Sequence, residues 1–403
     1  MKKTFLLLCL LSSFIVKGQW QSCDLNMIEA YCLASKDSMV CVGSSGMVFT
    51  SLNNGSTWMM SGSGLPQNLN ILNITISGST IFAGTLRGIW LSSDNGNSWI
   101  QANSGLTDTI VFSLTISGTD VLAGTHYGGV FRYTDNNGTW NITNIGLAQH
   151  KIYSLASAGN IIFAGSDSGK VFVSTNNGAQ WTIANFGLPS SRVSSLQIIG
   201  TFVFAGTINN GVYISTNNGN NWNNISSGLM SNSVLSLASF GTNILAGTDS
   251  GIYYSSDYGN QWNDLNMGMT GIATSIVRSI TISNSNIFIA LSTPIPANPV
   301  WYLPISEMIT NITEMGTAAM HFLTLYPNPT AGKFKLKSEL KIDLIEVYNV
   351  LGKKVFQTSN FNHQLDDEID LSSMPKGIYF VRVYNGRKGY DKKNSYSIVL
   401  ILI

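Results

Sequence analysis

The stretch Ser92-Ser-Asp94-Asn-Gly96-Asn-Ser-Trp99 decides the fold, because close copies of it recur along the chain. Each copy, which we call a box, places Asp or Asn two residues before a glycine and ends on a tryptophan. The tryptophans are spaced by 41, 41, 41, 41 and 40 residues, at Trp58, Trp99, Trp140, Trp181, Trp222 and Trp262. The third copy is one residue short, and the Asp or Asn positions are Asn53, Asp94, Asn136, Asn176, Asn217 and Asp257. A period this regular indicates a repeat architecture.

Each repeat also contains short stretches with the alternation of a β-strand. In the third repeat, residues 113–117 alternate, a turn follows, and residues 121–124 form an apolar run that ends in Gly124. Residues 129–133 supply a third strand that leads into the box, and a fourth begins at Trp140. Four antiparallel strands in a repeat of about 40–45 residues are typical of a β-propeller blade.

The number of blades follows from an aromatic residue on the third strand, which occurs at Phe49, Trp90, Phe131, Phe172, Tyr213, Tyr253 and Trp301. The last repeat, residues 276–306, lacks a box and a fourth strand, whereas Trp20 stands just before the first repeat. We therefore predict an all-β, seven-bladed β-propeller with four-stranded blades, in which the N-terminal strand closes blade seven and covers two open sheet edges. Six or eight blades remain alternatives.

The box has a structural explanation. Asp or Asn followed two residues later by Gly suits a tight turn, in which the side-chain oxygen accepts backbone N–H groups and Gly takes a positive φ. The tryptophan buries a large area against its neighbours. These features resemble the Asp-box (BNR) repeat of sialidases, sortilins and related secreted propellers, over most of residues 20–306. The resemblance implies that the box is a peripheral turn between the third and fourth strands, away from any catalytic centre.

Composition and charge exclude several classes of protein. The 403 residues carry 22 Lys and Arg against 21 Asp and Glu, and only 11% of residues are charged. So few charges argue against a coiled coil or a charged disordered chain, and the balance argues against nucleic acid as the main partner. Residues 19–306 hold 18 charged residues in 288, whereas residues 307–403 hold 22 in 97. This rise predicts a propeller at 19–306, a linker at 307–322 and a C-terminal domain at 323–403.

The N-terminus has the pattern of a secretory signal peptide. Lys2 and Lys3 precede an apolar run over residues 5–16, and Val16 and Gly18 suit a cleavage site before residue 19. We predict a signal peptide at 1–18, with a lipoprotein signal at Cys9 as the alternative. No later segment has the ~20 uninterrupted apolar residues of a membrane helix.

Cleavage would leave three cysteines, Cys23, Cys32 and Cys41. In an oxidising compartment two of them could form a disulfide, but the sequence does not select the pair. The other interpretation is that they are small apolar fillers on strands.

Residues 323–403 have the strand patterns of a small β-sandwich. They also resemble the C-terminal sorting domain of the type IX secretion system of Bacteroidetes-like bacteria, and the residues that carry the resemblance are Tyr326, Pro327, Asn328, Pro329, Gly332, Gly352, Gly377 and Tyr379. The resemblance implies export through the type IX machinery and a location at the cell surface or outside the cell. The apolar end at 398–403 departs from the family pattern. An unrelated adhesive sandwich is the alternative.

The chain offers few catalytic signatures. We find no Gly-x-Ser-x-Gly, no His-Glu-x-x-His, no phosphate loop and no Cys-x-x-Cys, and the four histidines have no metal-site spacing, so no metal or cofactor is expected. The enzyme hypothesis is a sialidase-like glycoside hydrolase. The resemblance to sialidases implies an arginine cluster that binds the substrate carboxylate, a Tyr activated by a Glu, and an Asp that acts as the acid. The candidates are Arg87, Arg132, Arg192, Arg278 and Glu29.

A binding site is expected on one rim of the propeller. In an up-and-down blade, the connections from the second to the third strand share a rim with those from the fourth strand to the next blade. The first set offers Arg87, His126, Tyr127, Asp167, Asn209 and Asp249, and the second Glu29, Asp108, Lys151 and Arg192. Residue type varies here on a constant framework, as on a binding surface. The Pro-rich loop at 293–299 lies on the same rim, and a solvated rim without a partner is the alternative.

We therefore expect an exported, non-catalytic propeller that binds an extracellular protein or a glycan through this rim. The alternative is a sialidase-like glycoside hydrolase on the same propeller.

Overall fold

The computed structural model describes residues 19–308, except 26, 28, 135–137, 148–149, 267–268, 270–274 and 293–297, together with segments 323–326, 332–338, 344–349, 354–358, 368–374, 378–384 and 395–402. The predicted signal peptide at 1–18 and most of the predicted linker lie outside the described residues.

Seven four-stranded antiparallel sheets form the propeller. The strands of blades one to four, from the centre outward, are β2 (Cys32–Lys36), β3 (Met39–Gly43), β4 (Val48–Ser51) and β5 (Met59–Ser61); β6 (Ile71–Ser77), β7 (Thr80–Thr85), β8 (Gly88–Ser92) and β9 (Ile100–Gln101); β10 (Val111–Ser117), β11 (Asp120–Thr125), β12 (Val130–Tyr133) and β13 (Trp140–Ile142); and β14 (Ile152–Ala158), β15 (Ile161–Ser166), β16 (Val171–Ser174) and β17 (Thr182–Ile183).

Blades five to seven follow the same order. Their strands are β18 (Val193–Ile199), β19 (Phe202–Thr207), β20 (Gly211–Ser215) and β21 (Asn223–Asn224); β22 (Val234–Phe240), β23 (Asn243–Thr248), β24 (Gly251–Ser255) and β25 (Asn263–Asp264); and β26 (Ile276–Ile282), β27 (Asn286–Ser292), β28 (Val300–Pro304) and β1 (Gln21–Ser22).

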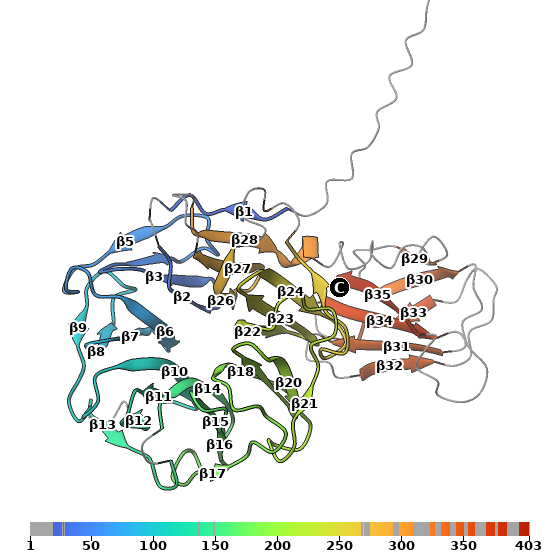
Figure 1. The fold of residues 1–403 in the computed structure, drawn as a ribbon. Coiled ribbons are helices and arrows are strands. Elements are labelled where there is room, and N and C mark those ends of the chain that lie inside the picture. The colour runs from blue at the N-terminus through green and yellow to red at the C-terminus, as the bar shows by residue number, and fades with distance from the viewer. Residues whose placement is uncertain are drawn as a thin grey trace, which may run out of the picture.

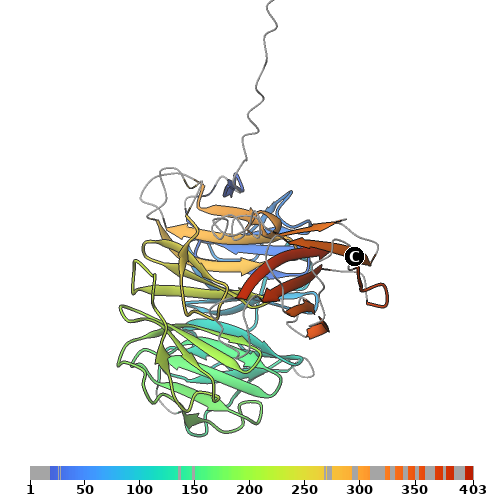
Figure 2. The same ribbon diagram turned by 90° about the vertical axis from the view of Figure 1, so that its right-hand side faces the viewer.

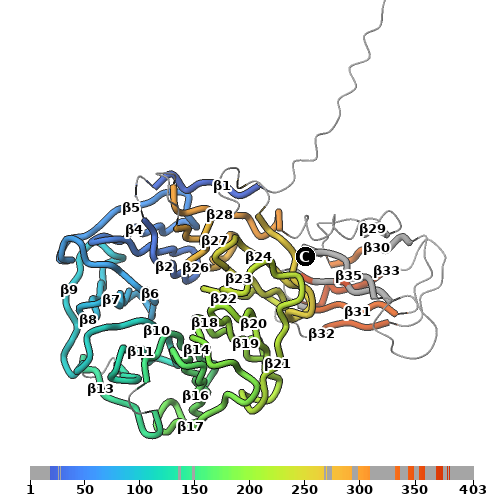
Figure 3. Tube along the Cα trace, viewed as in Figure 1, coloured from blue at the N-terminus to red at the C-terminus, as the bar shows by residue number. Residues whose placement is uncertain are grey.

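The first strands of the blades line the centre of a closed ring (Figures 1 and 3). Each of them contacts the first strand of the next blade, and β26 of blade seven contacts β2 of blade one. The prediction of seven blades is confirmed, and the alternatives of six and eight are wrong.

The blades approach closely because of a glycine near the end of the second strand in blades one to six. A Cβ on Gly165 would lie 2.6 Å from Cγ1 of Val193 on the next blade, and Gly206 and Val234 repeat this relation at 2.7 Å. The second strands are buried on both faces between neighbouring blades, which explains their continuous apolar runs.

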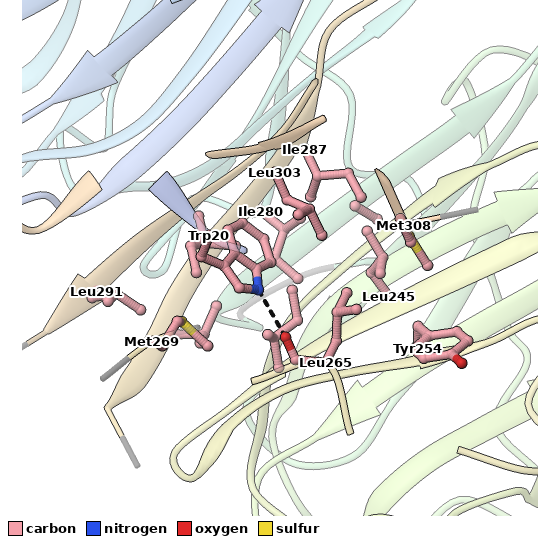
Figure 4. Packing of buried hydrophobic residues seen from close by; sticks show 14 residues of the cluster. Trp20, Leu245, Tyr254, Leu265, Met269, Ile280, Ile287, Leu291, Leu303 and Met308 are labelled. Carbon is pink, nitrogen blue, oxygen red and sulfur yellow. Dashed lines mark hydrogen bonds between the residues drawn. The ribbon is translucent and has the colours of Figure 1, made fainter. Parts of the chain in front are cut away.

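The N-terminal strand closes the ring as predicted. Strand β1 pairs antiparallel with β28, so that Gln21 lies opposite Tyr302 and Ser22 opposite Trp301. Trp20 is buried in the apolar cluster between blades six and seven, and its indole Nε1 donates to the Leu265 carbonyl (Figure 4).

Each described box connects the third strand to the fourth, as expected. In the second blade, Ser98 N–H donates to Asp94 Oδ1 at 2.9 Å, Gly96 N–H donates to Ser92 Oγ at 2.8 Å, and Gly96 has a φ of +89°. The same bonds recur with Asn53, Asn176, Asn217 and Asp257, whereas Asn136 lies outside the described residues. The serine that begins the box is therefore a second turn-forming side chain, which the sequence reasoning did not single out.

The tryptophans join neighbouring blades. Their indole Nε1 donates to the carbonyl that follows the fourth strand of the preceding blade, at 2.6–2.8 Å, for Trp140, Trp181, Trp222 and Trp262. Trp20 makes the same bond, so it is the blade-seven member of the series. Trp99 bonds within its own box, and Trp58 packs edge-on against Phe288 of blade seven.

The three described cysteines are free thiols. Cys32 occupies the place that a serine has in other blades, since its Sγ donates to the Ile71 carbonyl at 3.3 Å as Ser154 Oγ does to Val193 at 2.9 Å. Burial raises the pKa of Cys41 to about 12 and also raises that of Cys32. Both are small fillers on buried strands rather than reactive thiols.

The C-terminal part forms two sheets, which lie beside the ring of blades in Figure 1 and in front of it in Figure 2. One contains β29 (Leu323–Tyr326), β30 (Lys333–Ser338) and β33 (Glu368–Asp370), and the other β31 (Leu344–Asn349), β32 (Lys354–Thr358), β34 (Ile378–Tyr384) and β35 (Ser395–Leu402). Phe334 and Ile369 of the first and Ile345 and Val381 of the second are buried. The divergent apolar end of the chain is strand β35, which pairs with β34.

The sorting-motif residues fall partly within the described segments. Tyr326 ends β29, Tyr379 is buried on β34, and Gly332 has a φ of +109° where a Cβ would lie 2.7 Å from Ser372 Cα. Pro327, Asn328, Pro329, Gly352 and Gly377 lie outside them.

Candidate binding rim

The two predicted sets of loops meet on one rim. Backbone N–H groups of the second-to-third connections donate to carbonyls just before the first strands: His126 to Ile110 at 3.0 Å and Ile208 to Arg192 at 3.0 Å. The boxes lie with the first-to-second turns instead, since Asn54 N–H donates to the Ser38 carbonyl. The rim that carries the predicted binding residues is thus separate from the boxes.

The first strand of every blade from two to seven starts with an irregularity in its pairing. One residue is skipped in the register, as in a β-bulge, and bulges commonly re-aim side chains beside functional sites. The skipped residues are Leu72, Phe112, Tyr153, Ser194, Leu235 and Arg278. These side chains sit at the rim end of the strands that line the centre.

Six side chains on blades three to five form a continuous network, which we call the cation–aromatic cluster: Lys151, Tyr127, His126, Phe112, Tyr153 and Arg192. Phe112 and Tyr153 stack at a centroid distance of 4.4 Å and an angle of 12°. Edge-on contacts continue from Phe112 to His126 at 5.7 Å and from His126 to Tyr127 at 3.9 Å.

A cation lies over the aromatic ring at each end of this cluster. Lys151 Nζ is 5.2 Å from the centroid of Tyr127, and Arg192 Cζ is 4.3 Å from that of Tyr153. Lys151 and Arg192 occupy equivalent positions, because each immediately precedes the first strand of its blade. Among the described residues, neither cation has a carboxylate within 4.0 Å. Their charges are therefore available to a ligand.

Two carboxylates of the rim, Asp108 and Asp249, accept hydrogen bonds from their own and neighbouring loops. Asp108 accepts backbone N–H groups of Tyr127 at 2.5 Å, Gly128 at 2.8 Å and Ile110 at 3.1 Å. Burial opposes ionisation of Asp108, but these hydrogen bonds outweigh it and lower its pKa. Asp249 accepts from the hydroxyls of Ser231 and Ser250.

The remaining predicted rim residues stay outside the cluster. Arg87 is exposed on blade two, and Asn209, with a φ of +68°, shapes the blade-five turn. Asp167 borders the cluster, because its N–H donates to the Lys151 carbonyl at 3.3 Å. Most of the Pro-rich loop lies outside the described residues.

Sequence reasoning missed Phe112 and Tyr153. The available signal was an aromatic residue directly before a Ser near the start of the inner strand, as in Phe112-Ser113 and Tyr153-Ser154, which is the bulged position in these two blades.

A second group lies where blades seven and one meet. Tyr31 donates its hydroxyl hydrogen to Glu29 Oε2, and Arg278 Cζ is 5.9 Å from the Tyr31 ring. Burial, followed by the hydrogen bond and charge of Glu29, raises the pKa of Tyr31 to about 12, although Arg278 opposes this shift. The Tyr31 hydroxyl is therefore neutral at physiological pH.

In the described part of the chain, no three His, Cys, Asp or Glu side chains gather as a metal ion would require. The helices described there include none of the length and apolarity needed to cross a membrane.

A comparison with protein families identifies the C-terminal region. Residues 324–395 match the family model of the secretion system C-terminal sorting domain. The chain is a seven-bladed propeller with a type IX sorting domain. The sorting domain indicates export to the cell surface or the extracellular space, as predicted. No curated protein matches the chain.

Solved structures resemble the chain in fold. PorZ, a surface component of the type IX secretion system of Porphyromonas gingivalis, is 13% identical with a TM-score of 0.56, over 93% of this chain and 59% of that one. YCF48 of Cyanidioschyzon merolae is 16% identical with a TM-score of 0.55, over 71% of this chain and 98% of that one. The computationally designed Ika8 protein is 14% identical with a TM-score of 0.51, over 71% and 99%.

Proposed function

We propose that this exported propeller is a non-catalytic binding protein whose cation–aromatic cluster holds an extracellular protein or glycan. The observation that carries the proposal is that the cluster unites four predicted rim residues with two stacked, bulged aromatics. Tyr and Arg are among the residue types enriched in binding hot spots. Tyr127 is 63% exposed, so a ligand has direct access to the cluster.

The experiment compares three forms of the full chain on a glycan array and in pull-downs from surface-exposed proteins. Tyr127→Ala should remove the hit that the wild-type chain gives. Phe186→Ala removes an aromatic side chain that is 78% exposed beside the outermost strand of blade five, where its carbonyl accepts the Trp222 N–H at 2.9 Å, and it should retain the hit. Hits that survive Tyr127→Ala, or the absence of any hit, would contradict the proposal.

The same proposal includes the route by which the protein is exported. Residues 1–18 act as the signal peptide, the boxes are Asp-boxes with a purely structural role, and the sorting domain engages the type IX machinery. Deleting residues 323–403 should leave the propeller in the periplasm, as measured by cell fractionation. Unchanged surface display of the truncated chain would overturn this route.

One observation favours the glycoside hydrolase as a second candidate: Tyr31, Glu29 and Arg278 gather at one place on the rim. A Tyr nucleophile would require Glu29 as its base, because the raised pKa of Tyr31 keeps its hydroxyl protonated. Turnover of a sialoside by the full chain, lost in Tyr31→Phe, would support the hydrolase. No turnover across a sialoside panel would support the binding protein.

A further inference from the structure

The two charged side chains at the ends of the cluster are both cations. Lys151 and Arg192 carry unpaired positive charge at equivalent positions of adjacent blades. The nearby carboxylate of Asp108 already accepts three backbone N–H groups, and that of Asp249 accepts two hydroxyls. A complementary ligand therefore brings acceptors, and anionic ones pair best with two cations.

The surface between the two cations is aromatic. The Phe112 and Tyr153 rings stack on one another, and the guanidinium of Arg192 lies over Tyr153. A guanidinium stacked on a ring keeps the edge of its fork free for a carboxylate. The ligand thus combines an anionic group with an apolar or aromatic group beside it.

A sugar chain fits this surface poorly. Its hydroxyls would lie against the stacked Phe112 ring, which has no hydrogen-bonding group, and a hydroxyl buried without a partner costs free energy. An acidic peptide fits this surface better, because its carboxylates accept hydrogen bonds from the two cations and its apolar side chains need no hydrogen-bonding partner.

We propose that the cation–aromatic cluster binds an acidic protein segment in which a carboxylate stands next to an aromatic or apolar side chain. This inference rests on the proposed function and specifies the ligand of the same site.

The test uses the full chain on an array of random dodecapeptides, with polygalacturonate as an acidic glycan probe. Bound peptides should be enriched in Asp or Glu beside Phe, Tyr or Trp. Replacing the acidic residues of the strongest peptide by their amides should weaken its binding at least tenfold, and so should Arg192→Gln. Raising the salt concentration should weaken it further, since the two cations are near the surface.

The matched control is Lys36→Gln, which removes one positive charge at the end of β2 on the opposite rim and should change the affinity less than twofold. If Arg192→Gln lowers the melting temperature, Lys151→Gln tests the equivalent position on blade four.

The outcomes separate this inference from the proposed function. The ligand class would be wrong if no acidic peptide is enriched, or if polygalacturonate alone binds. The binding rim would still stand in these cases if the wild-type chain gives some other hit that Tyr127→Ala removes. If hits are insensitive to Tyr127→Ala and Arg192→Gln alike, both proposals fail.

Discussion

Trp20 Nε1 donates a hydrogen bond of 2.7 Å to the carbonyl oxygen of Leu265, although 245 residues separate the two. The bond has the geometry that tryptophans of the boxes form between other neighbouring blades. Blade seven is therefore completed by the start of the chain, and the ring has the same junction there as elsewhere.

Ring closure predicts that Trp20 contributes strongly to stability. Trp20 is 3% exposed, so Trp20→Ala should lower the free energy of unfolding by about 3–5 kcal/mol. Trp20→Phe keeps an aromatic ring but leaves the buried Leu265 carbonyl without its donor, and it should cost about 1–3 kcal/mol. Urea unfolding followed by tryptophan fluorescence measures both. A Trp20→Ala variant as stable as the wild-type chain would show that β1 does not close the ring.

Two glycine turns, one between blades four and five and one within blade four, predict different costs of substitution by alanine. Gly187 has a φ of +94°, and a Cβ there would lie 2.4 Å from the Trp222 carbonyl oxygen of the next blade. Gly159 has a φ of +60° with open space around it. Gly159→Ala should cost about 1–2 kcal/mol from backbone conformation alone. Gly187→Ala should cost about 1–3 kcal/mol more, because its Cβ collides with backbone. Equal unfolding free energies would argue against this close contact.

The box of blade two predicts a pH dependence. Hydrogen bonds from the side chain and backbone of Ser98, and then from Ser92, lower the pKa of Asp94 from 3.8 to about 2. A lowered pKa means that the stabilisation is complete above about pH 4 and is lost as the pH falls toward 2. Asp94→Asn should fold, because Asn53 holds the same position and donates its amide to Thr57 Oγ1 at 2.9 Å. The stability difference between wild type and variant should therefore change over this pH range, and a constant difference would contradict the assignment.

The buried thiols predict slow alkylation. With a pKa of about 12 for Cys41 and a raised pKa for Cys32, both remain protonated up to about pH 9 and unreactive in the folded chain. Iodoacetamide should label them only after unfolding in urea, as mass spectrometry would show. Rapid labelling of Cys41 in the folded protein, or a disulfide between any two of the three, would contradict the structure.

The architecture could be predicted from the sequence because each residue type that recurs in the repeat has one structural role. The glycines and the Asp or Asn of the boxes fix turns, and the tryptophans mark each junction between blades. The closing strand was predictable for the same reason. Trp20 stands before the first repeat, and it supplies the tryptophan and the fourth strand that the last repeat lacks.

The candidate site was only partly predictable. The connectivity of an up-and-down blade identifies His126, Tyr127, Lys151 and Arg192 as rim residues, but it cannot show which of them meet. Phe112 and Tyr153 read as ordinary strand residues, because a bulge shifts the register without leaving a clear mark in the sequence. Arg87 and Asn209 satisfied the same rule and lie outside the cluster, which depends on contacts between side chains of three blades.

The most direct test is hydroxyl-radical footprinting of the full chain, with and without the strongest binder from the peptide, glycan and surface-protein screens. We expect protection of Tyr127, Phe112 and Tyr153, with Phe186 beside the outermost strand of blade five unchanged. Protection of Phe186 or of the boxes, with Tyr127 still fully reactive, would show that the ligand binds elsewhere on the propeller.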